Sequence, residues 1–260
     1  MNFGREQSLL RQRLTAVGSP TAAAARQQEL GGEVTSLGAP DSEVRAAALA
    51  LVETYPQMGR AQMTAFVRTL WASKIHELRA VGVEILAARA ALLEPADLPF
   101  LEKLLGDETA APLVGPLADG ALGDLVARNK KLWKDLERFV KSGRKLLRRA
   151  AAAAVRQAVA ADAALFARFE KLVQPLLADA DAATNHELDR VLTALAATNH
   201  DAVRDYADRH GRKLKLPRPP AKKAAAAKVL PAARPLKKAA IKKPAIKKAA
   251  KKAAKKTTRK

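Results

Sequence analysis

The chain has 260 residues and no cysteine, so disulfide bonds and thiolate metal sites are excluded. Its formal net charge is +21, and 48% of its residues are hydrophobic while only 4% are aromatic. We therefore expect a core of small aliphatic side chains in a protein that binds a polyanion.

No membrane or secretory segment is expected. The first residues, Met1–Thr21, contain charges and lack the apolar run of a signal peptide. The longest run without charge, Leu14–Ala25, has 12 residues, whereas a spanning helix needs about 20 apolar residues. These features predict a cytoplasmic protein with no membrane partner.

The positive charge is concentrated in a C-terminal tail. Gly211–Lys260 holds 20 Lys or Arg and no Asp or Glu, which leaves residues 1–210 with 27 basic and 26 acidic groups. The tail repeats Lys, Ala and Pro, and its prolines and like charges oppose a helix, so we expect disorder in isolation. Cations without aromatic neighbours neutralise phosphates but do not stack on bases, so binding should be salt-dependent and largely independent of sequence. The tail residues expected to contact DNA are Lys237, Lys238, Lys242, Lys243, Lys247, Lys248, Lys251, Lys252, Lys255 and Lys256.

Apolar residues recur at helical spacing through most of residues 1–210. Helices are predicted around Val44–Leu51, Met63–Leu70, Leu78–Leu92, Phe100–Leu105, Pro112–Ala127, Leu132–Val140, Leu165–Leu176 and Leu188–Leu195. No segment has convincing period-two alternation between turn residues, so we expect an all-α fold. The alternating helix pairs favour a solenoid over a bundle. Trp71 and Trp133 lie on or beside apolar stripes and are predicted to be core residues.

Two local patterns predict where the last helices before the tail begin. Thr184 and Glu187 fit a capping box, and His186 is expected at a cap position. Asn199 or Asp201 is expected to open a separate last helix. The four histidines have no ligand spacing such as HExxH, and no phosphate-binding or dinucleotide motif is present. No metal or cofactor is therefore expected.

Four basic residues form a stripe on one predicted helix. Arg144 and Arg148 are four residues apart, as are Lys145 and Arg149, so each pair shares a helix face. We interpret the stripe as a patch that contacts phosphates, with an ordinary solvated face as the alternative.

Several runs resemble one protein family. LWASKIHELRAVGVEILAARAALLEPADLPFLEKLL (Leu70–Leu105), LVGPLADGALGDLVAR (Leu113–Arg128), LWKDLERFVKSGRKLLRRAAAAAV (Leu132–Val155) and LTALAATNHDAVRDYADRH (Leu192–His210) are similar, in order and spacing, to the DNA alkylation repair family of AlkD type. The resemblance covers about Ser36–His210. It implies a curved solenoid of HEAT-like helix pairs whose concave basic face holds duplex DNA.

The resemblance also implies a site. Enzymes of that family excise cationic alkylated purines, such as 3-methyladenine, using a Trp, an Asp, an Arg and a later Trp. Here the first Trp and the Asp fall on Ala111 and Gly115, the Arg is retained as Arg149, and the later Trp falls on Arg190. The aromatic faces and the carboxylate are thus missing, so no catalytic residue is assigned, and Asp119 is the only substitute carboxylate expected nearby.

We therefore expect a monomeric, nucleoid-associated protein that binds duplex, including damaged, DNA and lacks the family's glycosylase activity. One alternative is an active glycosylase that uses substituted residues, with Asp119 as the carboxylate. A second is a HEAT-like scaffold without enzymatic activity, whose tail binds RNA or ribosomes. The expected organisation is an N-terminal segment (residues 1–38), a HEAT-repeat domain (residues 39–210) and a basic tail (residues 211–260).

Overall fold

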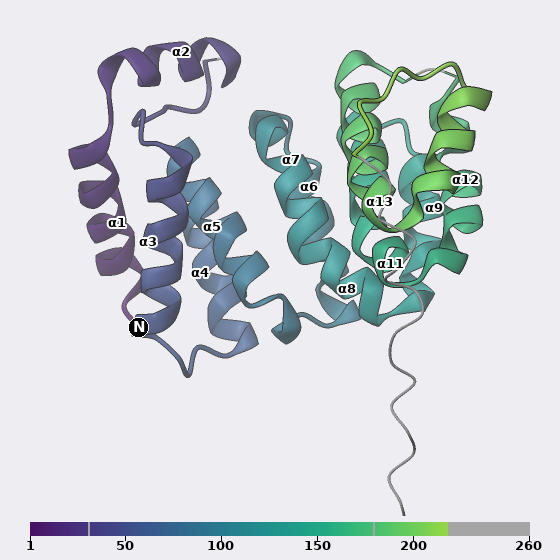
Figure 1. The fold of residues 1–260 in the computed structure, drawn as a ribbon. Coiled ribbons are helices and arrows are strands. Elements are labelled where there is room, and N and C mark those ends of the chain that lie inside the picture. The colour runs from purple at the N-terminus through teal and green to yellow at the C-terminus, as the bar shows by residue number, and fades with distance from the viewer. Residues whose placement is uncertain (31, 179, 218–260) are drawn as a thin grey trace, which may run out of the picture. The chain divides into compact units, whose positions relative to one another are not determined.

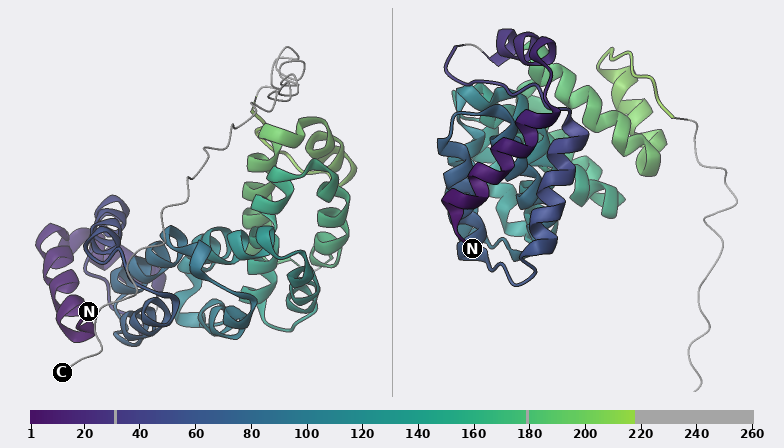
Figure 2. Two further views of the ribbon diagram at one scale, coloured as in Figure 1. Left: turned by 90° about the horizontal axis from the view of Figure 1, so that it is seen from below. Right: turned by 90° about the vertical axis from the view of Figure 1, so that its left-hand side faces the viewer.

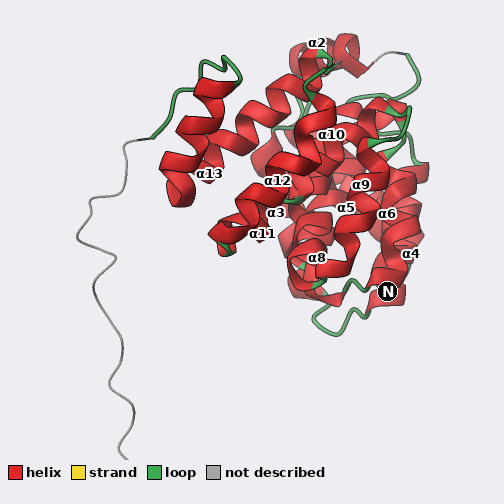
Figure 3. Cartoon of the chain, turned by 90° about the vertical axis from the view of Figure 1, so that its right-hand side faces the viewer, coloured by secondary structure: helices red, strands yellow, loops and turns green. Residues whose placement is uncertain are grey.

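The computed structural model describes residues 1–30, 32–178 and 180–217. This part of the chain consists of helices and loops, with no strand other than an isolated bridge between Thr35 and Ile75 (Figure 3). The predicted all-α fold is confirmed. Contacts divide the chain after Pro220, and all described residues belong to the first unit, Met1–Pro220.

The α-helices follow one another with short connections (Figure 1). The first are α1 (Phe3–Val17), α2 (Pro20–Leu30), α3 (Asp41–Thr54), α4 (Arg60–Ala72), α5 (His76–Ala88), α6 (Leu98–Leu105) and α7 (Val114–Leu117). They are followed by α8 (Gly123–Arg128), α9 (Trp133–Val140), α10 (Lys145–Ala154), α11 (Arg156–Ala161), α12 (Phe166–Val173) and α13 (Ala182–Arg209). Short 3₁₀ turns and one π-helical turn, η4 (Ala118–Leu122), lie between them.

Helices that are close in sequence are also neighbours in space within this unit. Helices α3 and α4 pack against α5, and α1 packs against α3 and α4. Further along, α9 and α13 pack against α10, while α11 packs against α8 and α13 (Figures 1 and 2). This succession of packed helices is the solenoid arrangement that the helix pairs predicted.

Hydrogen bonds between successive helix pairs reveal a repeat that the apolar pattern does not define sharply. Trp71 bonds to Asp107 over a separation of 36 residues, Arg128 to the carbonyl of Ala90 over 38, and Asn199 to the carbonyl of Val159 over 40. HEAT-like repeats have periods of about 40 residues. Each pair of helices is therefore tied to its neighbour at nearly corresponding positions.

The core is built mainly from aliphatic side chains, with few rings. Trp71 and Trp133 are both buried, as predicted. Helix α10 contributes five consecutive buried alanines, Ala150–Ala154, and packs against α7, η4, α8, α9, α11 and α13. Because a methyl group projects so little, these neighbours can approach the α10 backbone closely. Arg149 directly precedes this block.

Buried Glu77 connects the N-terminal residues to the rest of the unit. Its carboxylate accepts hydrogen bonds from the Ser36 hydroxyl (2.6 Å) and from the backbone N–H groups of Leu37 (2.8 Å) and Gly38 (3.0 Å). Gly38 has a φ of +72°, in the region that favours glycine. The loop after α2 is therefore anchored on α5.

Two predictions about the last helices are wrong. Asp181, not Thr184, is the N-cap of α13, and its Oδ1 accepts from the Thr184 backbone N–H at 2.7 Å. His186 lies within this helix and not at its cap. Because Asp181 takes the N-cap, Glu187 does not form the expected capping box, and its side chain instead lines a cavity. By contrast, the predicted start of a last helix is confirmed, because α13 consists of two helices that meet at a kink at Asn199 (φ −127°, ψ 41°).

None of the helices in residues 1–30, 32–178 and 180–217 is both long and apolar enough to cross a membrane.

Candidate functional site

A cavity of about 630 Å³ lies between three parts of the repeat array that are distant in sequence. Its walls are formed by Pro112, Gly115, Pro116, Asp119, Arg149, Ala183, His186, Glu187 and Arg190. The first four come from the segment η3–α7–η4, Arg149 comes from α10, and the rest come from α13. Four residues singled out from the sequence, Gly115, Asp119, Arg149 and Arg190, therefore meet at one place.

The segment that forms the first wall is irregular because of its composition. Pro112 and Gly115 interrupt regular helical hydrogen bonding and packing, so the predicted long helix Pro112–Ala127 is divided into 3₁₀, α and π turns. Asp119 lies in the π turn η4. Such turns are common at functional sites, because the wider turn redirects a side chain.

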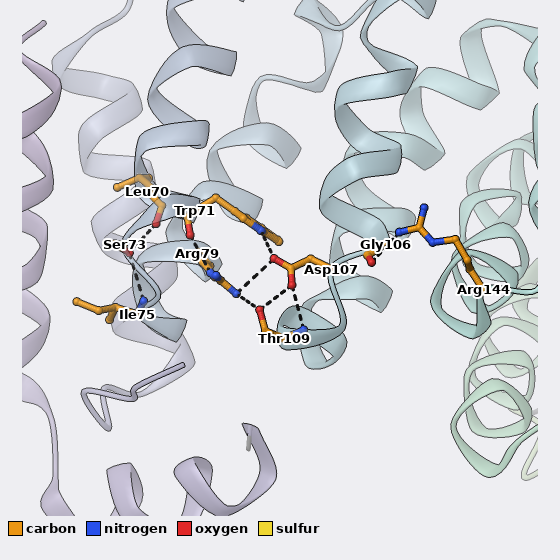
Figure 4. A network of polar contacts seen from close by, with 9 residues as sticks. All are labelled: Leu70, Trp71, Ser73, Ile75, Arg79, Gly106, Asp107, Thr109 and Arg144. Atoms are coloured by element: carbon orange, nitrogen blue, oxygen red, sulfur yellow. Dashed lines mark hydrogen bonds and ion pairs between the residues drawn. The ribbon is translucent and has the colours of Figure 1, made fainter. Parts of the chain in front are cut away.

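A polar network fixes the start of this segment. Asp107 is the N-cap of η3 (Glu108–Leu113), and it binds Trp71, Arg79 and Thr109 (Figure 4). The buried Arg79 donates hydrogen bonds to the carbonyl of Trp71 (3.0 Å) and to the hydroxyl of Thr109 (2.7 Å). The wall of the cavity is thereby anchored on α4 and α5.

Both oxygens of Asp119 face arginines. Arg156 Nε bonds to Oδ1 at 2.5 Å, and Arg190 Nη1 lies 3.6 Å from Oδ2. Asp119 is also shielded from solvent, with 19% of its side chain exposed. Asp119, the substitute carboxylate expected from the sequence, is therefore already paired with two guanidinium groups.

Glu187 differs from Asp119 in how its two oxygens are used. Arg190 donates to Oε1 from Nε (3.1 Å) and from Nη2 (2.6 Å). Oε2 makes no hydrogen bond or ion pair with any residue in the described part of the chain, and it faces Gly115. Burial alone would lower the pKa of Arg190, but the hydrogen bond to Glu187 and the charge of Asp119 raise it.

Arg149 lines the cavity and has spare hydrogen-bonding capacity. Its Nη2 donates to the carbonyl of Ala111, while its buried Nε has no partner among the described residues. Burial lowers the pKa of the Arg149 guanidinium, an effect that Glu187 and Asp181 partly oppose. With Arg156 and Arg190, three guanidinium groups and the carboxylates of Asp119 and Glu187 lie at or beside the cavity, so these five groups have a formal charge of +1.

The other members of the predicted basic stripe are not among the residues that line this cavity. Arg144 caps α10 and donates to the carbonyl of Gly106 at 2.8 Å (Figure 4). Lys145 is exposed, and Arg148 is half-buried and has a partner. The role of the stripe in contacting phosphates stays a prediction. The predicted tail contacts, Lys237 to Lys256, lie outside the described residues.

Sequence reasoning placed Arg149 and Arg190 at the site but missed Glu187 and Arg156. Nothing near Glu187 in the sequence signals its role, because its neighbours there are those of an ordinary helix. Only the docking of α13 beside α7 and η4 brings Glu187 to Gly115.

A protein-family match covers most of the chain. The sequence pattern of the family described as DNA alkylation repair enzyme matches residues 10–228. This range begins earlier and ends later than the resemblance to that family, which covers about Ser36–His210. No curated protein matches the chain. The match spans most of the chain and includes every residue that lines the cavity. The chain therefore belongs to the DNA alkylation repair enzyme family.

Proposed function

We propose that the protein binds duplex DNA, largely independently of sequence, through the face that carries the Arg149 cavity. The observation that carries this proposal is the state of Arg149, whose buried Nε has no partner in the described residues and whose side chain lines an open cavity. Its Nη2 bonds to the carbonyl of Ala111, so the buried N–H at Nε is the unpaired group, and a phosphate oxygen at the cavity could accept from this guanidinium.

The Lys-rich tail, most of which lies beyond the described residues, also supports this proposal. Its 20 basic groups would raise the affinity by holding cations close to DNA that the first unit has bound. If the full chain neutralises about eight phosphates, log K should fall with log salt with a slope of about −7. Association with the nucleoid would follow from this sequence-independent binding.

We do not assign base excision to the positions at which the resemblance places the family's catalytic residues. Ala111 and Gly115 carry neither a ring nor a carboxylate, and both oxygens of Asp119 face arginines. Excision with substituted residues is a second candidate function. One observation favours it, namely that Glu187 keeps one carboxylate oxygen free at the cavity wall.

The test is duplex binding by fluorescence anisotropy across a salt series. It compares the full chain with a chain ending at Pro217, the last described residue, since Arg212 still binds Asp189 and Asn185 on α13. We expect the shorter chain to bind more weakly and with a shallower salt slope.

In the shorter chain, Arg149→Gln should weaken binding further and reduce the slope by about 1, as expected for the loss of one phosphate contact. Arg45→Gln, at an exposed position on α3, is the matched control. Absence of binding without the tail, or equal affinity of the two variants, would contradict the proposed role of the cavity face.

A further inference from the structure

A second cavity, of about 250 Å³, lies beside the segment η3–α7. It shares Pro112 and Pro116 with the Arg149 cavity, but most of its other walls come from α2, α3 and α5. Its charged or titratable residues are Arg26, Glu29, Asp41, His76 and Glu84. Three carboxylates against one guanidinium give a formal charge of −2 with His76 neutral. We call this the acidic cavity, and its charge favours a cation and disfavours a phosphate.

The two arginines near the acidic cavity do not cancel this charge. Arg26 Nη1 binds Oδ1 of Asp41 at 3.0 Å, and this pair is neutral as a whole. Arg45, which does not line the cavity, lies 3.7 Å from Glu84, and 70% of its side chain is exposed, so water screens this pair strongly. Glu29 makes no hydrogen bond or ion pair with any described residue. A cation in the cavity would therefore meet at least one carboxylate that has no other partner.

A buried polar group independently indicates that the acidic cavity takes a ligand. His76 lines the cavity and is only 5% exposed, yet its ring makes no hydrogen bond with any residue in the described part of the chain. Burial lowers the pKa of His76, so the imidazole is neutral and one ring nitrogen is an acceptor. Because buried polar groups nearly always have partners, an N–H donor in the cavity would complete this site.

The face of α5 that lines the acidic cavity has polar groups at its ends and apolar groups between them. His76, Ala80, Val83 and Glu84 share this face. The separation of His76 from Glu84 along the helix axis is about 12 Å. Val44 of α3, which packs beside α5 (Figure 1), adds a further apolar side chain to the lining. An occupant with cationic ends and an apolar middle would match this order of side chains.

The start of α5 does not oppose a cation at the His76 end. The backbone N–H of His76 donates to the carbonyl of Thr35 at 2.9 Å, and Glu77 supplies a carboxylate in the first turn of the helix. Both features offset the partial positive charge of a helix N-terminus.

The volume of the acidic cavity limits the size of its occupant. Cavities for drug-sized ligands measure about 300–1,000 Å³, so one of about 250 Å³ accepts a smaller molecule. We infer that the acidic cavity binds a linear aliphatic diamine, with one ammonium group at Glu29 and His76, the other at Glu84, and the carbon chain against Ala80 and Val83. Each ammonium is a compact cation with three donors, which suits acceptors that come from different helices. This inference goes beyond the proposed DNA binding and does not depend on it.

The test is isothermal titration calorimetry of the full chain, without DNA, against 1,5-diaminopentane and pentylamine. Pentylamine has the same carbon chain but a single ammonium group, as a lysine side chain has. We expect the diamine to bind about fivefold more tightly, the upper end for one ion pair in contact with water. Equal or weaker binding of the diamine, or no binding of either amine, would overturn the inference.

Substitution of Glu84 tests the second ammonium site. Glu84→Gln should weaken binding of the diamine about fivefold, to the affinity of pentylamine, because one of its two ion pairs is lost. The matched control is Glu53→Gln, which removes an exposed carboxylate on α3 that does not line the cavity. It should leave both affinities unchanged. A preference for the diamine that persists in Glu84→Gln, or that disappears equally in the control, would contradict the assignment of Glu84.

Filling the acidic cavity separates a built site from attraction by surface charge. Ala80 is half-buried and lines the cavity, so Ala80→Leu would occupy its space without changing any charge. We expect neither amine to bind to this variant, whereas amines held only by surface carboxylates would bind as before and overturn the inference. Urea unfolding shows whether Ala80→Leu is folded. Glu84, whose side chain is 33% exposed, tests the inference even where that variant does not fold.

Discussion

The indole Nε1 of Trp71 donates a 2.8 Å hydrogen bond to Oδ2 of Asp107, which links α4 to the N-cap of η3 (Figure 4). The same carboxylate accepts from the backbone N–H (3.0 Å) and the hydroxyl (2.6 Å) of Thr109 and lies 3.6 Å from Arg79 Nη1. This network anchors the segment that leads to the cavity wall at Gly115.

Asp107 should make stability depend on pH in a defined direction. Burial would raise the pKa of Asp107, but hydrogen bonds from Thr109 and Trp71, with the charge of Arg79, hold it below its ordinary value of 3.8. A carboxyl group whose pKa is lowered by folding stabilises the protein above its unfolded pKa, and this contribution is lost as the pH falls through the folded pKa.

We therefore expect Asp107→Asn to lower the free energy of unfolding by about 1–3 kcal/mol at pH 7. The deficit should begin to shrink as the pH falls below about 4, where the unfolded state takes up the proton, and should vanish as the pH falls through the lower pKa of folded Asp107. Urea unfolding between pH 3 and pH 7 measures both quantities. Glu53→Gln, at an exposed position on α3, is the control and should have little effect. A deficit that stays constant over this range would contradict the expectation.

Arg79 should be essential to the same network. It is 4% exposed, donates to Trp71 and Thr109, and lies over the Trp71 ring at 5.4 Å. Arg79→Met keeps much of the volume but removes every donor, and breaking a buried ion pair from one side costs about 3–5 kcal/mol.

Thermal or urea unfolding measures the loss. The comparison is Arg45→Met, since Arg45 forms an exposed ion pair with Glu84 at 3.7 Å, and such pairs contribute at most about 1 kcal/mol. Equal losses for the two variants would show that the buried network contributes nothing beyond a surface ion pair.

Substitution of two glycines that both have positive φ should distinguish the cost of backbone strain from the cost of steric overlap. A Cβ on Gly38 (φ +72°) would lie 2.2 Å from the carbonyl oxygen of Ser19, whereas a Cβ on Gly211 (φ +62°) would meet nothing within 4 Å. We expect Gly211→Ala to cost about 1–2 kcal/mol from conformation alone. Gly38→Ala should cost clearly more, because backbone atoms have to move. Unfolding free energies of the two variants provide the measurement, and a similar cost at both sites would contradict the close approach of Ser19 to Gly38.

The period of apolar residues was sufficient to predict the helical class and the burial of Trp71 and Trp133, because burial of one helix face follows from local spacing. The resemblance assigned Gly115 and Arg149 to one site, and both line the same cavity. It could not identify Glu187. The pair Thr184 and Glu187 satisfies the local rule for a capping box, but Asp181 takes the N-cap, so Glu187 is available for a tertiary contact that no local pattern describes.

The hydrogen bonds that join positions 36 to 40 residues apart have a consequence for the order in which the protein opens. A repeat bound only to its neighbours can detach from one end while the remainder stays folded. The Glu187 and Arg190 side of the cavity belongs to α13, whereas Gly115 and Arg149 belong to earlier repeats. Fraying of α13 would therefore remove the wall that contains Glu187 and Arg190, while the wall that contains Gly115 and Arg149 would stay folded. Amide hydrogen exchange in α13 should slow when DNA is bound, because an occupant held by both walls links the last repeat to those before it.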